Sequence, residues 1–163
     1  QSEAMGPVSA AAKRMAGQLM GRWVTVFGAG TLAPVARRWK GQINEVAKAV
    51  ANFEFIPEAD HNTLAGIQYP PEVVPPHVIS LFLRAPSDHP RNRLRLDMTR
   101  QTYMLEGLNT DSYKAKGDSV IAHIWTALHF GDYIAYYLAM AYGVDPTPVA
   151  ALVSLKAALK EAK

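Results

Sequence analysis

The chain has 163 residues, of which 49% are hydrophobic, carries a formal net charge of +3 and contains no cysteine. This length and apolar content suit one domain with a full core, and the lack of cysteine excludes disulfides and thiolate metal sites. The positive excess is small and scattered, whereas nucleic-acid-binding proteins usually gather basic residues on one face. We therefore expect no nucleic-acid partner.

The sequence also predicts no membrane association. No apolar run reaches the roughly 18 residues of a membrane-spanning helix, and residues 1–15 lack the apolar core of a signal peptide. Without cysteine the chain suits a reducing compartment, so a cytoplasmic protein is expected. Gln1 in place of an initiator methionine indicates a fragment or a trimmed chain.

The first elements are a helix, a strand and a glycine-containing turn. An Ala-rich amphipathic pattern predicts a helix over Val8–Met20, and the apolar run Trp23–Phe27 predicts a buried strand. The following pattern, Gly28-x-Gly30-x-x-Ala33, is the skeleton of a dinucleotide-binding fingerprint. The complete fingerprint requires an acid at the end of a second strand, and none is well placed here. A tight strand-to-helix turn is therefore favoured over the site of a nucleotide-dependent oxidoreductase.

The next stretch holds two candidate catalytic groups. Apolar residues at steps of three and four predict a helix over Leu32–Ala51, and Glu45 lies within it. Phe53–Ile56 is predicted to be a short strand, His61–Ile67 a brief helix or turn, and the proline-rich segment Tyr69–Pro76 a loop. Proton-transfer sites are commonly built from a carboxylate and an imidazole. On spacing alone, a solvated helix acid and a surface histidine are the simpler interpretation.

The second half continues the alternation of strands and helices. Strands are predicted over Val78–Leu83 and Thr110–Ala115, and helices over Pro90–Gly107, Val120–Tyr142 and Val149–Ala162. This order predicts an α/β fold, a three-layer αβα sandwich with a mostly parallel sheet that ends in long C-terminal helices. The predicted helix over Val120–Tyr142 is apolar enough to pack on two sides, against the sheet and against a second subunit or domain. The histidines are not at metal-ligand spacing, so no metal site is predicted.

Separate blocks of the sequence, in order, resemble a known family. They are Leu32-Ala33-Pro34-Val35-Ala36-Arg37-Arg38-Trp39-Lys40, Gln42-x-Asn44-Glu45-x-Ala47-Lys48, Pro57-Glu58-x-Asp60-His61-Asn62, Gly131-Asp132-Tyr133, Tyr136-Tyr137-Leu138-Ala139, Gly143-Val144-Asp145-Pro146-Thr147-Pro148-Val149 and Leu155-Lys156. These residues are similar to the bifunctional phosphoglucose/phosphomannose isomerases, and specifically to the second of that family's two sugar-isomerase (SIS) domains. The middle of the chain, about residues 68–118, is less similar.

The resemblance implies that residues 1–163 form a single SIS domain, the second half of a two-domain isomerase whose N-terminal SIS domain is absent from this chain. It implies a homodimer that binds phosphosugars. The implied reaction interconverts glucose 6-phosphate or mannose 6-phosphate with fructose 6-phosphate. A base moves the proton through an enediol intermediate, without a metal or another cofactor.

The resemblance also implies roles for individual residues. Glu45 matches the catalytic base, His61 matches a histidine that assists ring opening across the dimer interface, and Lys156 matches a lysine that contacts the sugar oxygens. Thr147 and Asn62 are expected to contact the substrate. The residue types suit these roles, since a desolvated carboxylate can shuttle a carbon-bound proton, a histidine can donate and accept near neutral pH, and a lysine can stabilise an enediolate. Glu45 and His61 are therefore expected to converge in space.

Two positions depart from the family pattern. Asp60 precedes the histidine where the family usually has asparagine, and Val46 follows the glutamate where the family usually has a second asparagine. The serine- and threonine-rich phosphate loop of the family belongs to the absent N-terminal domain, so the isolated chain is expected to be inactive. A module that binds phosphosugars without turnover is therefore the alternative.

Overall fold

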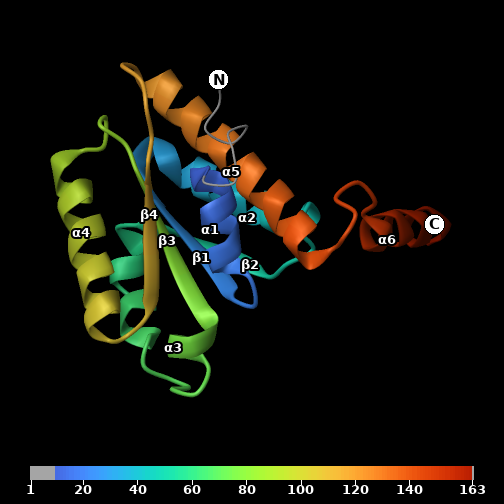
Figure 1. The fold of residues 1–163 in the computed structure, drawn as a ribbon, viewed down its shortest axis with the longest axis horizontal. Helices are drawn as coiled ribbons and strands as arrows, with labels where there is room; N and C mark the ends of the chain where they lie inside the picture. The colour runs from blue at the N-terminus through green and yellow to red at the C-terminus, as the bar shows by residue number, and fades with distance from the viewer. Residues whose placement is uncertain (1–9, 163) are drawn as a thin grey trace.

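The structure, a computed structural model, describes residues 10–162 and confirms the α/β class. Its elements are α1 (Ala11–Leu19), β1 (Trp23–Ala29), η2 (Gly30–Leu32), α2 (Ala33–Glu45), β2 (Ala51–Ile56), η3 (Glu58–Asp60), η4 (Thr63–Gly66), α3 (Val74–His77), β3 (Val78–Arg84), α4 (Pro90–Leu105), β4 (Asn109–Lys114), α5 (Val120–Tyr142) and α6 (Ala150–Glu161). Within the described residues the four strands form one parallel sheet in the order β2-β1-β3-β4. Figure 1 shows α4 on one face of this sheet and α1, α2 and α5 on the other.

The two faces of the sheet belong to two separate apolar clusters. In β1, Val24 and Val26 face the cluster that contains α1, α2 and α5, while Phe27 faces the cluster that contains α4. Leu81 and Phe82 divide in the same way in β3. Side chains of a strand alternate between faces, and strands covered on both faces are apolar throughout. These central strands therefore have the continuous apolar pattern from which the sequence predicted them.

The end of α2 differs from the prediction. The helix was expected to continue to Ala51, but it ends at Glu45, and Ala51 already belongs to β2. Asn44 Nδ2 donates to the Ala49 carbonyl oxygen at 2.8 Å, and Lys48 adopts a left-handed backbone with φ of 55°. These contacts turn the chain back across the end of the helix. The apolar periodicity of the sequence continues past Glu45, and for this reason it predicted a helix longer than the one observed.

Smaller corrections apply to the loops. The segment expected to be loop over Tyr69–Pro76 ends in the one-turn helix α3, which begins at Val74 with prolines in its first turn. The brief helix or turn expected over His61–Ile67 is the 3-10 helix η4, which Asn62 caps by accepting from the Thr63 amide at 2.6 Å. The predicted first helix begins at Val8, and this residue lies outside the described part of the chain.

The long helix α5 has the predicted bounds. Ser119 caps its start by accepting from the Ala122 amide at 3.2 Å, and Gly143 ends it in the left-handed conformation. One side of α5 packs on α1 and α2, with Ile134 and Leu138 fully buried. Elsewhere along α5, Trp125 remains exposed. The predicted second packing partner of α5 therefore does not come from the described residues of this chain.

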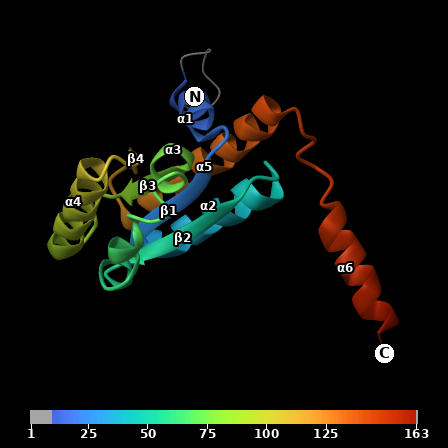
Figure 2. The ribbon, with the colours of Figure 1, turned by 90° about the horizontal axis from the view of Figure 1, so that it is seen from below.

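The last helix, α6, stands apart from the three layers. Figures 1 and 2 both show it projecting away from the sheet beyond the end of α5. None of its residues is buried against residues 10–162, although it carries the apolar side chains Val153, Leu155 and Leu159. An apolar helix that is exposed on every side requires a packing partner.

Candidate active site

Glu45 is the last residue of α2 and lies at the N-terminal edge of the sheet. The helix starts beyond the carboxyl end of β1 and runs back along the sheet, after which residues 46–50 lead into β2. Ala51, at the start of β2, pairs with Val24, at the start of β1. Glu45 therefore lies at the end of the sheet where the strands begin, and its side chain is exposed.

Lys48 joins this helix end to the turn that carries Thr147. Its ammonium donates to the Glu45 carbonyl oxygen and, at 3.3 Å, to the carbonyl oxygen of Pro146. The Thr147 amide in turn donates to Asp145 Oδ1 at 2.9 Å, which holds the turn. The structure thus brings Glu45 and Thr147 to the same end of the sheet, although about a hundred residues separate them in the sequence.

A cavity of about 540 Å³ opens at this edge of the sheet, next to the end of α2. Its lining is Gly21, Arg22, Trp23, Ala47, Lys48, Ala49, Val50, Tyr142 and Val144. The Tyr142 hydroxyl accepts from the Gly21 amide at 2.7 Å and ties the end of α5 to the approach of β1. The volume lies within the range of ~300–1,000 Å³ that is typical of small-molecule sites.

His61 and Asn62 lie at the opposite edge of the sheet. They follow β2 at its carboxyl end, where Ile56 pairs with Ala29, the last residue of β1. Because β2 has six residues, a distance on the order of 20 Å separates its two ends. Within one chain, Glu45 and His61 therefore do not meet. Their convergence through a second copy stays a prediction.

The residues around His61 are held by structural contacts. Asn62 donates from Nδ2 to Glu58 Oε1 at 2.7 Å, in addition to capping η4. Asp60, the departure from the family pattern, accepts from the Thr99 hydroxyl at 2.7 Å and lies 4.0 Å from Arg95. Asp60 therefore anchors this loop to α4.

Lys156 lies on the projecting helix α6, and its side chain is exposed. The other predicted site residues, Glu45, His61, Asn62 and Thr147, are exposed as well. A general base that removes a carbon-bound proton needs a site from which water is largely excluded. The described residues of a single chain do not cover Glu45 in this way, so the walls of such a site would have to come from another domain or subunit.

Lys48 belongs to one of the blocks that resemble the family, but no role was predicted from the sequence for this residue, which links Glu45 to the distant turn. A lysine with positive φ was not foreseen because only glycine and asparagine signal a left-handed turn in sequence. The amides beside Glu45 are also engaged structurally, since Gln42 Nε2 donates to Asp132 Oδ1 on α5 at 2.6 Å. The surroundings of Glu45 were therefore less predictable than its place near a helix end.

Gly28 has a packing explanation. A Cβ atom at this position would overlap the backbone carbonyl of Leu32 and touch the Ala36 side chain at 3.0 Å. Glycine here allows α2 to start close against β1, which accounts for the first position of the dinucleotide pattern.

Within residues 10–162, no group of three or more histidine or acidic side chains could hold a metal ion, and no helix is both long and apolar enough to span a membrane.

Comparison with known proteins adds the context for this geometry. Residues 9–159 match the model of the bacterial phospho-glucose isomerase C-terminal SIS domain. The bifunctional phosphoglucose/phosphomannose isomerase of Caldicellulosiruptor bescii is 36% identical over 93% of this chain and 45% of its own length. The enzyme of the same name from Aquifex aeolicus is 33% identical over 91% of this chain and 46% of its own length. The chain therefore spans about half the length of these curated relatives.

A solved structure shares the fold. The glucose-6-phosphate isomerase-like protein of Thermus thermophilus superposes with a TM-score of 0.72 at 23% identity, covering 91% of this chain and 48% of that one. The parallel sheet flanked by helices is thus the fold that the resemblance implied.

Proposed function

From the premise that this chain belongs to the family of bacterial phosphoglucose isomerase C-terminal SIS domains, we propose that it supplies part of the active site of an aldose-ketose isomerase. The substrates are glucose 6-phosphate or mannose 6-phosphate and fructose 6-phosphate. The observation that supports this assignment is the position of Glu45, exposed at the end of α2, where the neighbouring Lys48 lines the 540 Å³ cavity and contacts the turn that carries Thr147.

In the proposed reaction Glu45 is the base. It removes the proton from the carbon next to the carbonyl, and it returns that proton to the neighbouring carbon after an enediol intermediate has formed. Lys156 stabilises the negative charge on the sugar oxygens, and Thr147 contacts the substrate from the turn that Lys48 holds. Neither a metal nor an organic cofactor takes part, so we expect activity to be unchanged in EDTA.

His61 acts from a second copy of the chain. Because His61 and Glu45 lie at opposite ends of the sheet in one copy, a homodimer would have to bring the His61 of one chain to the Glu45 of the other. His61 then assists ring opening, and Asn62 positions the loop and contacts the sugar. An N-terminal SIS domain binds the phosphate and helps to exclude water from Glu45, while the projecting helix α6 carries Lys156 toward it. This enzyme is expected in the cytoplasm.

The test is the isomerisation of fructose 6-phosphate by the protein that contains both SIS domains. Glu45→Gln keeps the size of the side chain but removes the base, and we expect the rate to fall by roughly two to four orders of magnitude. Unchanged activity in this variant would refute the role of Glu45. An inactive but folded wild-type dimer would favour the alternative, a module that binds phosphosugars without turnover.

Mixing two inactive variants tests whether the site is shared between copies. Glu45→Gln and His61→Asn homodimers are each expected to be inactive. Subunit exchange creates heterodimers with one site that has both native residues, so about a quarter of the wild-type activity should return. If exchange occurs and no activity returns, Glu45 and His61 do not act together across the interface.

A further inference from the structure

A second cavity, of about 400 Å³, lies at the carboxyl ends of β3 and β4. Its lining is Arg84, Ala85, Pro86, Arg93, Ser112 and Lys114. In open parallel sheets, ligands bind in crevices beyond the carboxyl ends of the strands. This cavity occupies that position, whereas Glu45 and the 540 Å³ cavity lie at the other end of the sheet.

The lining is cationic, and strand register creates the cluster. Arg84 and Lys114 are paired positions at the ends of adjacent strands, where like charges repel. Ser112 lies two residues before Lys114 and therefore shares its face of the sheet, and Arg93 approaches from the first turns of α4. Three cations and one hydroxyl group thus line the cavity, and no carboxylate does.

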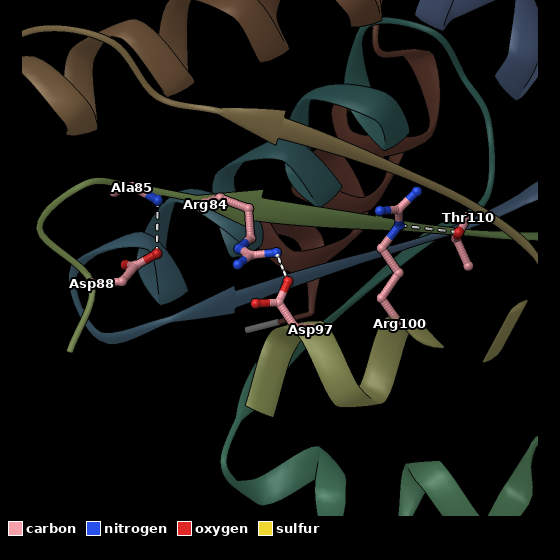
Figure 3. Close-up of polar contacts among 6 residues, drawn as sticks. All are labelled: Arg84, Ala85, Asp88, Asp97, Arg100 and Thr110. Carbon is pink, nitrogen blue, oxygen red and sulfur yellow. Dashed lines mark hydrogen bonds and ion pairs between the residues drawn. The ribbon is translucent and has the colours of Figure 1, made fainter. Parts of the chain in front are cut away.

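Arg84 is held in place by Asp97, and one of its nitrogen donors has no acceptor among the described residues. Figure 3 shows its guanidinium extending toward α4, where Nη1 donates to Asp97 Oδ1 at 2.6 Å. The Arg84 side chain is only 20% exposed. Its Nε atom is buried and has no hydrogen-bond acceptor among residues 10–162. A buried donor without an acceptor is costly, and Arg84 is one of the residues that line the cavity.

The nearby acids leave the cavity positive. Asp97 points at Arg84 from the α4 side and is 61% exposed. Asp88 is buried and accepts from the Ala85 amide at 2.7 Å, which closes the turn after β3 (Figure 3). Arg93 and Lys114 form no ion pair with any described residue, although Arg93 lies close enough to Asp88 for its charge to lower the pKa of that carboxyl group. These two cations therefore face the cavity beside one fixed guanidinium.

We propose that this cavity binds the phosphoryl group of a small metabolite. Arg84 presents a fixed planar donor, Arg93 and Lys114 supply charge, and Ser112 supplies a hydroxyl group, which together suit the tetrahedral oxygens of phosphate. The volume accommodates a phosphate together with a small organic group. The site uses none of Glu45, His61 or Lys156, so it stands independently of the isomerase assignment.

Amide chemical shifts of the 15N-labelled chain would locate the binding. Inorganic phosphate and fructose 6-phosphate are titrated separately, with chloride holding the ionic strength constant. We expect saturable shifts at the amides of Ala85 and Lys114. Tighter binding of the sugar phosphate would identify a phosphomonoester as the occupant, and tighter binding of inorganic phosphate would identify the free ion.

A charge-matched pair of variants provides the control. Arg93→Gln with Lys114→Gln removes two cations from the lining, while Arg37→Gln with Arg91→Gln removes two exposed cations that do not line the cavity. The dissociation constant should rise about tenfold or more in the first pair and stay within about twofold in the second. Equal weakening in both pairs, no saturable shift at this cavity, or the same shifts with chloride alone would overturn the proposal.

Discussion

Replacing Gly131 by alanine tests how closely α2, the helix that carries Glu45, packs on α5. Trp39 on α2 is 1% exposed, and its indole Nε1 donates to the Ala127 carbonyl oxygen on α5 at 2.8 Å. A methyl group at residue 131 would lie only 2.5 Å from the Cδ1 and Cε2 atoms of this indole. The ring would have to move, because real contacts are not that short.

The magnitude follows from three effects. Overpacking costs about 1–3 kcal/mol, and loss of the indole hydrogen bond costs about 0.5–1.5 kcal/mol. Alanine in place of glycine inside a helix returns about 1 kcal/mol. We therefore expect Gly131→Ala to lower the free energy of unfolding by about 1–3 kcal/mol, and the melting temperature by about 2–4 °C for each kcal/mol.

The assay is urea unfolding followed by far-UV circular dichroism, with Gly41→Ala as the matched control. Gly41 lies inside α2, and no heavy atom would come within 4 Å of a Cβ atom there. Gly41→Ala should therefore stabilise the chain by about 0.5–1 kcal/mol. If both substitutions changed stability in the same direction, the packing of Trp39 against Gly131 would not be as described.

Two further predictions concern backbone conformation and pH. Lys48→Gly and Lys48→Ala both remove the ammonium group, but only glycine accepts φ of 55° without strain. The glycine variant should therefore be more stable than the alanine variant by about 1 kcal/mol in urea unfolding. Equal stabilities of the two variants would show that the left-handed turn relaxes. Burial raises the pKa of Asp88 above its ordinary value of 3.8, against the lowering by the Ala85 amide and by Arg84. The native state therefore binds this proton more readily than the unfolded state, and the contribution of Asp88 to stability should rise as the pH falls through the raised pKa toward 3.8. Asp88→Asn keeps an acceptor for Ala85 and should be more stable than wild type at pH 7, and this difference should shrink as the pH falls toward 3.8. A difference that stays constant from pH 7 down to pH 3.8 would contradict the raised pKa.

The sequence alone determined most element positions, because each depends on local signals. The bounds of α5 follow from the Ser119 cap and from Gly143, and β1 and β3 follow from apolar runs that are buried on both faces. The blocks around Glu45 and His61, together with the blocks near the C-terminus, indicated the family, which the comparisons confirmed.

Only the tertiary structure decided what lies beside what. Glu45 and His61 are 16 residues apart in the sequence, yet a helix end followed by a strand must cross the sheet, which places them at opposite edges. Arg84 and Lys114 are distant in sequence but adjacent through strand register. The end of α2 depends on the contact of Asn44 with Ala49. Such contacts form between side chains and backbone groups that no local pattern specifies, so the candidate sites required the fold.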